Sequence, residues 1–228
     1  MWFAMINGNA SRLKEGQWTV FKELYSYDAV VIDNQGRAWL GDDKNGVIVF
    51  DTDGKQVMTL TKEDGLPTSD VRSLFSFGDT IWIGTTEGLA KYENEKVSVV
   101  FGKGDPNLPS SNISAMIQMK NGEYLIGATA GIVRYDGSKS EILINFFQQN
   151  PSATLMQLSQ EKSGRVWAGT SNGLFYADDL KNWKRLTTAN GLPTNNITAL
   201  HIDPLGGIWV GGGASFDGGG ILHMAPTK

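Results

Sequence analysis

The chain contains no cysteine and no apolar run long enough to cross a membrane. The first absence excludes disulfides and thiolate metal sites. The second argues against membrane insertion, since a spanning helix takes about 20 apolar residues. Basic residues are not in excess either: 20 lysines and arginines stand against 24 aspartates and glutamates, a net charge of −4. Nucleic acid is therefore not expected as a partner, because binding phosphates needs a basic face.

The chain does contain a short motif that is repeated five times. It consists of an aromatic or large apolar residue, then an aliphatic residue or alanine, then glycine. The copies are Trp39-Leu40-Gly41, Trp82-Ile83-Gly84, Leu125-Ile126-Gly127, Trp167-Ala168-Gly169 and Trp209-Val210-Gly211. Successive glycines are 43, 43, 42 and 42 residues apart. A fixed period of this length indicates a repeat architecture.

Each repeat is expected to form four short strands. In the fourth repeat, apolar runs at 155–159, 165–169, 174–176 and 183–186 are separated by turns rich in Gly, Asn, Asp and Ser. Four strands in about 40–45 residues are typical of a propeller blade. We therefore predict an all-β fold, a single β-propeller domain over residues 1–228. The blades are expected at 27–61, 71–101, 113–147, 155–187 and 197–224.

The fifth repeat has three expected strands instead of four. Residues 17–21, just before the first repeat, resemble a fourth strand. We predict five four-stranded blades closed by this N-terminal strand, which would remove the exposed sheet edges of an open array. Residues 1–15 are interpreted as a strap over one face. The alternative aligns residues 2–13 with the second and third strands of a sixth blade that lacks its first strand.

Similar linkers connect several of the repeats. They are Asp64-Gly65-Leu66-Pro67-Thr68-Ser69-Asp70-Val71, Asn107-Leu108-Pro109-Ser110-Ser111-Asn112-Ile113 and Asn190-Gly191-Leu192-Pro193-Thr194-Asn195-Asn196-Ile197. Together with the Trp-aliphatic-Gly motif, they resemble the two-component regulator propeller repeat, over roughly residues 27–224. The resemblance implies a β-propeller with a sensing or binding role, often towards carbohydrate breakdown products, in a periplasmic or extracellular setting. No signal peptide is visible, and the kinase of the family's sensors is not present in this sequence.

The expected ligand face is the one where the second-to-third turns meet the linkers. Candidate contacts are the polar residues of these segments and one aromatic residue: Asn45, Glu87, Thr129, Asn172, Phe216, Asp217, Asn112, Asn195 and Asn196. The last turn, 212–219, is longer than the others, and insertions often add binding to a scaffold. Phe216 could stack on a sugar ring or a base, and Asp217 could accept hydroxyl hydrogen bonds. The alternative is that Phe216 packs against the strap.

Two further residues have candidate roles on first strands. Arg72 could hold a carboxylate, such as that of an acidic sugar, or it could pair with Asp28 or Asp70. His201 is a weak catalytic candidate. A histidine that lines the core or channel is the simpler interpretation, because no nucleophile or second histidine lies near it in the pattern.

No metal site or cofactor is predicted. The segments 33–36 and 51–54 superficially resemble calcium loops, but they lack the remaining ligands. Tight Asp-Gly and Asn-Gly turns explain them without metal.

Three functions remain open from the sequence. The first is a non-enzymatic module that binds a small polar ligand, plausibly a saccharide, or a protein partner. The second is a propeller enzyme, a lyase or hydrolase, with His201 near the axis. The third is a scaffold that assembles with itself, although a monomer is favoured.

Overall fold

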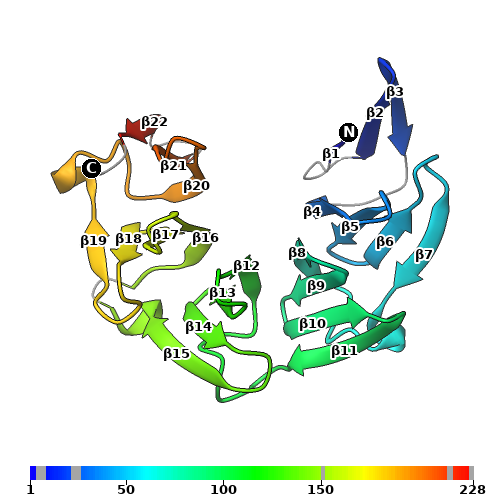
Figure 1. Cartoon of the computed structure of the whole chain (residues 1–228), viewed down its shortest axis with the longest axis horizontal. Helices are drawn as coiled ribbons and strands as arrows, with labels where there is room; N and C mark the ends of the chain where they lie inside the picture. The colour runs from blue at the N-terminus through cyan, green and yellow to red at the C-terminus, as the bar shows by residue number, and fades with distance from the viewer. Residues whose placement is uncertain (4–8, 22–26, 150–151, 215–217, 226–228) are drawn as a thin grey trace. The chain divides into compact units, whose positions relative to one another are not determined.

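The computed structural model describes residues 1–3, 9–21, 27–149, 152–214 and 218–225 (Figure 1). These residues form six small antiparallel sheets, so the all-β prediction is confirmed. The chain divides into two compact units, one of residues 1–105 and 111–113, the other of residues 106–110 and 114–228. None of the helical turns in the described residues is long and apolar enough to span a bilayer.

The first unit contains three of the sheets. A three-stranded sheet has the order β1 (Trp2–Phe3), β2 (Ala10–Lys14), β3 (Gln17–Phe21). A four-stranded sheet follows, with β4 (Tyr27–Ile32), β5 (Ala38–Asp42), β6 (Gly46–Phe50) and β7 (Gln56–Leu60). The next consists of β8 (Val71–Phe77), β9 (Thr80–Thr85), β10 (Gly88–Glu93) and β11 (Lys96–Phe101). The short 3-10 helix η1 (Lys62–Asp64) lies in the linker between them.

The second unit contains the other three sheets. One consists of β12 (Ile113–Gln118), β13 (Tyr124–Ala128), β14 (Gly131–Tyr135) and β15 (Ser140–Asn145), and another of β16 (Leu155–Gln160), β17 (Val166–Thr170), β18 (Gly173–Ala177) and β19 (Lys184–Leu186). The last sheet has three strands, β20 (Ile197–Ile202), β21 (Ile208–Ala214) and β22 (Gly218–Met224). The linkers contain η2 (Phe146–Gln148) and η3 (Thr188–Asn190).

The repeat glycines let each sheet approach the next. A Cβ atom on Gly41 would lie 2.6 Å from Cγ1 of Val71, the first residue of the following sheet. The same substitution at Gly169 would place Cβ 2.9 Å from Cγ2 of Ile197. Both distances are shorter than van der Waals contact, so only glycine fits at this point of the second strand.

The aromatic residue of the motif packs between neighbouring sheets. Trp39 is fully buried and belongs to a cluster with Ile81, Ile83 and Ala90 of the next sheet. Trp82 and Trp167 are buried too, and Leu125, which replaces tryptophan in the third repeat, is 0% exposed. Trp209 differs, with 43% of its surface exposed. The tryptophan of the last sheet therefore lacks the cover that the other copies have.

The N-terminal residues form a sheet instead of the expected strap. Trp2 and Phe3 pair with β2, and Ala10 on β2 lies opposite Phe21 on β3. Trp2, Ala10 and Phe21 pack on Leu40 and other residues of the next sheet. Strand 17–21, expected to complete the last blade, is thus the outer strand of its own sheet.

The long turn expected at 212–219 is partly strand. Gly212, Gly213 and Ala214 pair with Gly220, Gly219 and Gly218, so the hairpin of β21 and β22 extends beyond the repeat. Glycine lowers strand propensity, so a run of glycines by itself favours a turn over a strand. Antiparallel pairing within the hairpin overrides that preference.

Candidate functional site

The linkers and the second-to-third turns form a rim in each unit, which we call the linker–turn rim. In the first unit, Gly46 N donates to Ser69 O (3.0 Å) and Thr86 N to Asp70 O (3.1 Å). One linker therefore joins the turns of the two sheets that it connects. The second unit repeats the arrangement, for example with Gly213 N donating to Asn196 O at 3.1 Å. The segments predicted to form the ligand face are adjacent within each unit.

The linker motif has a structural cause. In the first linker, Thr61 is the N-cap residue just before η1, and the Asp64 carboxylate accepts the backbone N–H of Thr61 at 2.9 Å. Gly65 then adopts a left-handed φ of 106°, and Leu66 is buried. The Asp-Gly-Leu order thus supplies a cap, a left-handed residue and a core anchor.

The Asn-Gly-Leu linker of the second unit is built in the same way. Asn190 Oδ1 accepts the backbone N–H of Thr187 at 3.0 Å, Gly191 has a φ of 96°, and Leu192 is buried. Both linkers are consequently held firmly beside the turns. The Asp-Gly-Leu or Asn-Gly-Leu motif of the linkers therefore has a structural role, which is to shape the rim.

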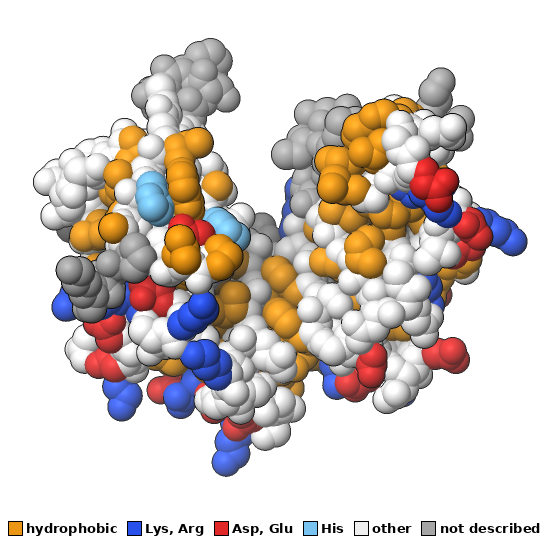
Figure 2. All heavy atoms as spheres, turned by 45° about the horizontal axis from the view of Figure 1, so that its top comes forward, with side chains coloured by type: hydrophobic (Ala, Val, Ile, Leu, Met, Phe, Trp, Pro, Cys, Tyr) orange, Lys and Arg blue, Asp and Glu red, His pale blue; other side chains and the backbone are white. Residues whose placement is uncertain are grey.

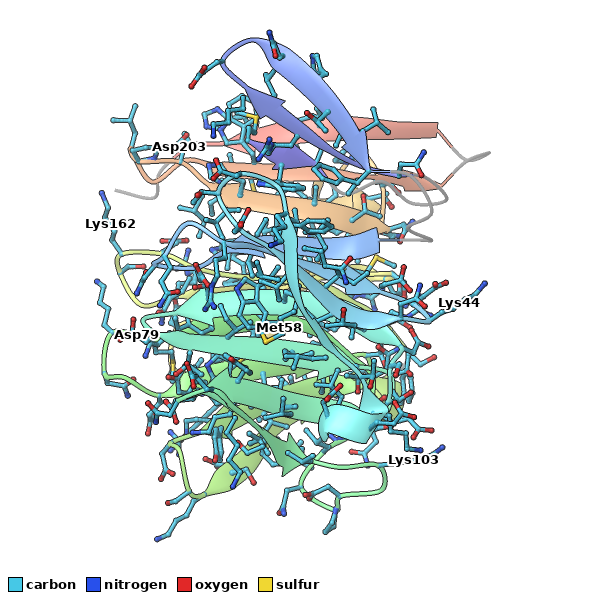
Figure 3. The ribbon with its side chains drawn as sticks, turned by 90° about the vertical axis from the view of Figure 1, so that its right-hand side faces the viewer. Lys44, Met58, Asp79, Lys103, Lys162 and Asp203 are labelled. Atoms are coloured by element: carbon cyan, nitrogen blue, oxygen red, sulfur yellow. The ribbon has the colours of Figure 1, made fainter. Side chains whose placement is uncertain are left out.

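Two ion pairs occupy the rim of the first unit. Arg72 Nε lies 2.8 Å from Asp70 Oδ1, and Thr86 Oγ1 donates to the other Asp70 oxygen at 3.2 Å. Glu87 accepts a hydrogen bond from Lys103 Nζ at 2.5 Å, and this bond lowers the pKa of the Glu87 carboxyl below its usual value. Figure 3 shows Lys44 and Lys103 at the end of the unit opposite to Asp79.

The other predicted residues of the first unit lie in a turn and in a linker of the rim. The backbone N–H of Asn45 donates to the buried carboxylate of Asp42 at 2.6 Å, which fixes the turn. Asn112 is partly buried in the linker before β12. The alternative partner of Arg72, Asp28, has a side chain outside the described residues, and Asp70 is the partner that the structure shows.

Asparagine side chains of the second unit hold the rim together. Asn172 Oδ1 accepts a hydrogen bond from the guanidinium of Arg185, and Asn172 Nδ2 donates to Ser152 O at 3.3 Å. Asn195 Oδ1 accepts from Thr188 N at 2.8 Å, and Asn196 Nδ2 donates to Gly213 O at 3.0 Å. Arg185 is the charged rim residue that the sequence analysis missed. The register between β18 and β19, which places it beside the Asn172 turn, could have indicated it.

Thr129 and the long turn complete the predicted set. Thr129 Oγ1 lies 2.9 Å from Ser110 Oγ, so the turn after β13 is tied to the linker before β12. Phe216 and Asp217 lie outside the described residues, and their ligand contacts remain a prediction.

His201 has a histidine neighbour that the sequence analysis did not expect. It lies opposite Trp209, which in turn lies opposite His223, so the three side chains share one face of the last sheet. The rings of Trp209 and His223 stack at 4.3 Å, and His223 Nε2 lies 3.4 Å from Asp203 Oδ2. Figure 2 shows the two histidines, in pale blue, among apolar side chains. The His201 side chain is exposed, so it is not a core residue, and its place in a channel stays a prediction.

In the first unit, a polar cleft of about 230 Å³ lies at the end opposite to the linker–turn rim (Figure 3). Asp33 is central to it: its Oδ2 atom accepts from Arg37 Nε at 2.6 Å and from Trp39 Nε1 at 2.8 Å. Burial raises the pKa of Asp33, but the hydrogen bonds from Trp39 and Arg37 outweigh it, so the pKa is lowered. Asn34 Nδ2 donates to Asp79 Oδ1 at 2.9 Å. These internal bonds account for the calcium-like segment 33–36 as a turn.

The sheets and the repeated motif are those of a β-propeller repeat protein. Residues 191–214 match the model of the family described as two component regulator propeller. This segment contains Gly191-Leu192-Pro193 of the linker and the Trp209 motif, so the resemblance to that family is confirmed. No curated protein sequence matches the chain.

Several solved structures have a similar fold. The extracellular domain of a hybrid two component system from B. thetaiotaomicron is 23% identical, with a TM-score of 0.75 over 92% of this chain and 30% of that one. PorZ, a surface component of the type-IX secretion system of Porphyromonas gingivalis, is 15% identical, with a TM-score of 0.69 over 92% of this chain and 35% of its own. Virginiamycin B lyase from Staphylococcus aureus is 12% identical, with a TM-score of 0.65 over 87% and 69%. The chain spans only 30% of the length of the first structure.

Proposed function

We propose that the chain is a non-enzymatic, sensor-type binding domain whose ligand contacts lie on the linker–turn rim. The observation that carries this proposal is the pairing of Arg72 with Asp70 and of Glu87 with Lys103 on one rim. Side chains of both signs, held by firmly bonded linkers, offer donors and acceptors in fixed positions. The likeness to the extracellular domain of a two component system supports a sensing role.

A small polar ligand, above all an acidic saccharide, fits this chemistry best. The Arg72 side chain is 39% exposed, so its guanidinium can reach a ligand carboxylate without leaving the sheet. Asp70 and Glu87 can accept hydroxyl hydrogen bonds. Asn172, Asn195, Asn196 and Thr129 would position the rim of the second unit more than they would bind ligand, because their side chains bond to the protein itself.

We also propose that the N-terminal sheet is an incomplete sixth blade. The pairing of Ala10 with Phe21 matches that of Leu89 with Phe101, in which a third strand meets its fourth. This register supports the alternative of a sixth, incomplete blade at the N-terminus over five blades closed by residues 17–21.

The test is a binding screen with a matched control. Thermal shift with galacturonate oligomers, glucuronate and neutral maltotetraose should give a hit for an acidic sugar. Ligand at 100 times Kd stabilises the native state by about 2.7 kcal/mol. Titration calorimetry should then show at least roughly ten-fold weaker binding for Arg72→Ala, a loss of about 1.4 kcal/mol.

His201→Ala is the control, because His201 lies on the last sheet and outside the rim. It should bind like the wild type. Binding lost in His201→Ala but kept in Arg72→Ala would contradict the rim as the binding site and favour the enzyme alternative. In that case the wild type should convert the bound sugar, and His201→Ala should not. If none of these sugars binds, a protein partner becomes the better proposal.

A further inference from the structure

The polar cleft of the first unit lies between two neighbouring sheets. Its volume of about 230 Å³ is below the roughly 300–1,000 Å³ of sites for drug-sized molecules. One wall is formed by the β4–β5 turn and the start of β5, with Asp33 and Arg37. The other wall belongs to the next sheet, with Asp79 from the β8–β9 turn and Tyr92 and Glu95 from the β10–β11 hairpin. The cleft therefore has the size for one small molecule and presents charges of both signs to it.

The Arg37 guanidinium has hydrogen-bond donors to spare. Its Nε donates to Asp33 Oδ2 at 2.6 Å, and within the described residues its Nη1 and Nη2 groups make no hydrogen bond. The corresponding arginine of the second unit, Arg165, has a further partner, since its Nε donates to Asp178 Oδ1 at 2.6 Å. The free N–H groups of Arg37 can thus bind an oxygen atom of a ligand in the cleft.

The opposite wall carries two carboxylates that have no ion pair among the described residues. Asp79 accepts a hydrogen bond from the neutral amide of Asn34 at 2.9 Å. Glu95 has no hydrogen bond to any described residue. The Asp33 carboxylate, in contrast, is neutralised by Arg37. The cleft therefore retains two uncompensated negative charges, which favour a positively charged ligand.

The backbone at Glu95 is unusual for a glutamate. The β10–β11 hairpin turns through Asn94 and Glu95, with left-handed φ values of 52° and 60°. Such a turn favours glycine, and Gly54 and Gly137 have the positive φ in the corresponding turns of two other sheets. Glutamate is thus kept in a conformation that costs free energy, although its carboxylate makes no described contact within the protein. A role towards a ligand in the cleft accounts for it.

An aromatic ring completes this wall. Tyr92 is partly buried, its ring packs on the Trp39 ring with 5.0 Å between centroids, and its hydroxyl has no hydrogen bond among the described residues. A tyrosine ring attracts an ammonium group, and its hydroxyl both donates and accepts hydrogen bonds. The cleft thus combines partners for a positive charge with partners for oxygen atoms.

We propose that this cleft is a second ligand site, separate from the linker–turn rim, for a small hydroxylated amine such as an amino sugar. The ammonium group would lie against Asp79 and Glu95, while Arg37 would donate to a hydroxyl oxygen. A ligand carboxylate is disfavoured, because it would face the same two carboxylates. The acidic saccharide proposed for the rim is therefore not expected here.

Glucosamine is the probe, and glucose is its matched control. The two sugars have nearly the same size, and glucose has a neutral hydroxyl where glucosamine has the ammonium group. Titration calorimetry in an amine-free buffer should show binding of glucosamine and at least roughly ten-fold weaker binding of glucose, because charge-assisted hydrogen bonds are lost. No binding of glucosamine, or equal binding of both sugars, would overturn the proposal.

A conservative variant tests the carboxylate. Glu95→Gln removes the charge and keeps the shape of the side chain, so it should bind glucosamine at least roughly ten-fold more weakly than the wild type. Glu15→Gln is the matched control, because Glu15 is another exposed turn glutamate of the first unit, with a φ of 52°, and it does not line the cleft. It should bind like the wild type. Unchanged binding by Glu95→Gln, or equal losses in both variants, would contradict the assignment.

The Trp39 indole reports whether the amine binds in the cleft. Its N–H group donates to Asp33 Oδ2 at 2.8 Å, at the wall that faces Glu95. In proton–nitrogen correlation spectra, the assigned indole signal of Trp39 should move as glucosamine is added to the wild type, and it should stay in place in Glu95→Gln. Binding by calorimetry without movement of this signal would locate the amine outside the cleft and overturn the proposal. None of these outcomes depends on whether the rim binds an acidic sugar.

Discussion

At the scale of single residues, the repeat glycines determine how closely neighbouring sheets pack. We expect Gly41→Ala to destabilise the protein by about 1–3 kcal/mol, the usual cost of overpacking, because the new methyl group would lie 2.6 Å from Val71, which is fully buried. Gly102→Ala is the control, since a Cβ there meets nothing within 4 Å. It should change stability by less than about 0.5 kcal/mol. Urea unfolding measures both, and equal effects would contradict the close approach.

A turn carboxylate gives a prediction about acid stability. Asp179 accepts the backbone N–H groups of Asn182 and Lys181 at 2.8 and 2.9 Å, and these bonds lower its pKa from 3.8 to about 2. A folded pKa below the unfolded one contributes stability that is complete above pH 3.8 and is lost as the pH falls towards 2. Asp179→Asn removes this titration.

The test compares the two proteins across that window. The melting temperature of the wild type should fall more steeply than that of Asp179→Asn between pH 3.8 and 2, while the difference between them should stay constant from pH 5 to 7. Parallel curves through the acid range would show that the turn bonds do not hold the carboxylate in its ionised form.

At the scale of elements, the sequence predicts the strands inside the repeats well. The expected strands 155–159 and 165–169 correspond to β16 (Leu155–Gln160) and β17 (Val166–Thr170). These limits are set locally, by turns such as Ser163-Gly164 and by the alternation of side chains. The period of the glycines then transfers the same limits to the other repeats.

The elements outside the repeat could not be predicted as well, because their partners are chosen by non-local pairing. β1 has only two described residues, Trp2 and Phe3, which is too short for a periodic pattern. Residues 17–21 have the composition of an outer strand, but composition does not say which sheet the strand joins. For the rim, the sequence indicated which linkers and turns lie side by side, while their role as a ligand face stays a prediction. It did not show that Asn172 and Asn195 would be used in hydrogen bonds to the protein itself.

The same substitution should have different costs in two sheets. Trp39 is fully buried, donates to Asp33 and contacts Tyr92, so Trp39→Ala should cost about 3–5 kcal/mol. Trp209 has the equivalent position but is 43% exposed, and Trp209→Ala should cost about 1 kcal/mol. Chemical denaturation of both variants gives the comparison. A similar large loss at Trp209 would mean that the face of the last sheet is covered.

At the scale of the whole molecule, the described contacts join sheets that are neighbours in sequence. Trp39 and Tyr92 belong to a cluster between the second and third sheets of the first unit. Trp167 belongs to a cluster between the last two sheets of the second unit. A chain built in this way is stabilised by the sum of its sheets and of the interfaces between adjacent ones.

This additivity can be measured with double-mutant cycles. Trp39→Ala and Trp167→Ala share no contact within their clusters, so their losses of stability should add to within about 0.5 kcal/mol. Trp39→Ala and Tyr92→Ala remove two rings whose centroids lie 5.0 Å apart, so they should couple by about 0.5–1.5 kcal/mol. Unfolding of the three single variants, the two double variants and the wild type in urea gives both coupling energies. If the distant tryptophans couple as strongly as the adjacent rings, the stability of the protein is a property of the whole chain, and the nearest-neighbour description fails.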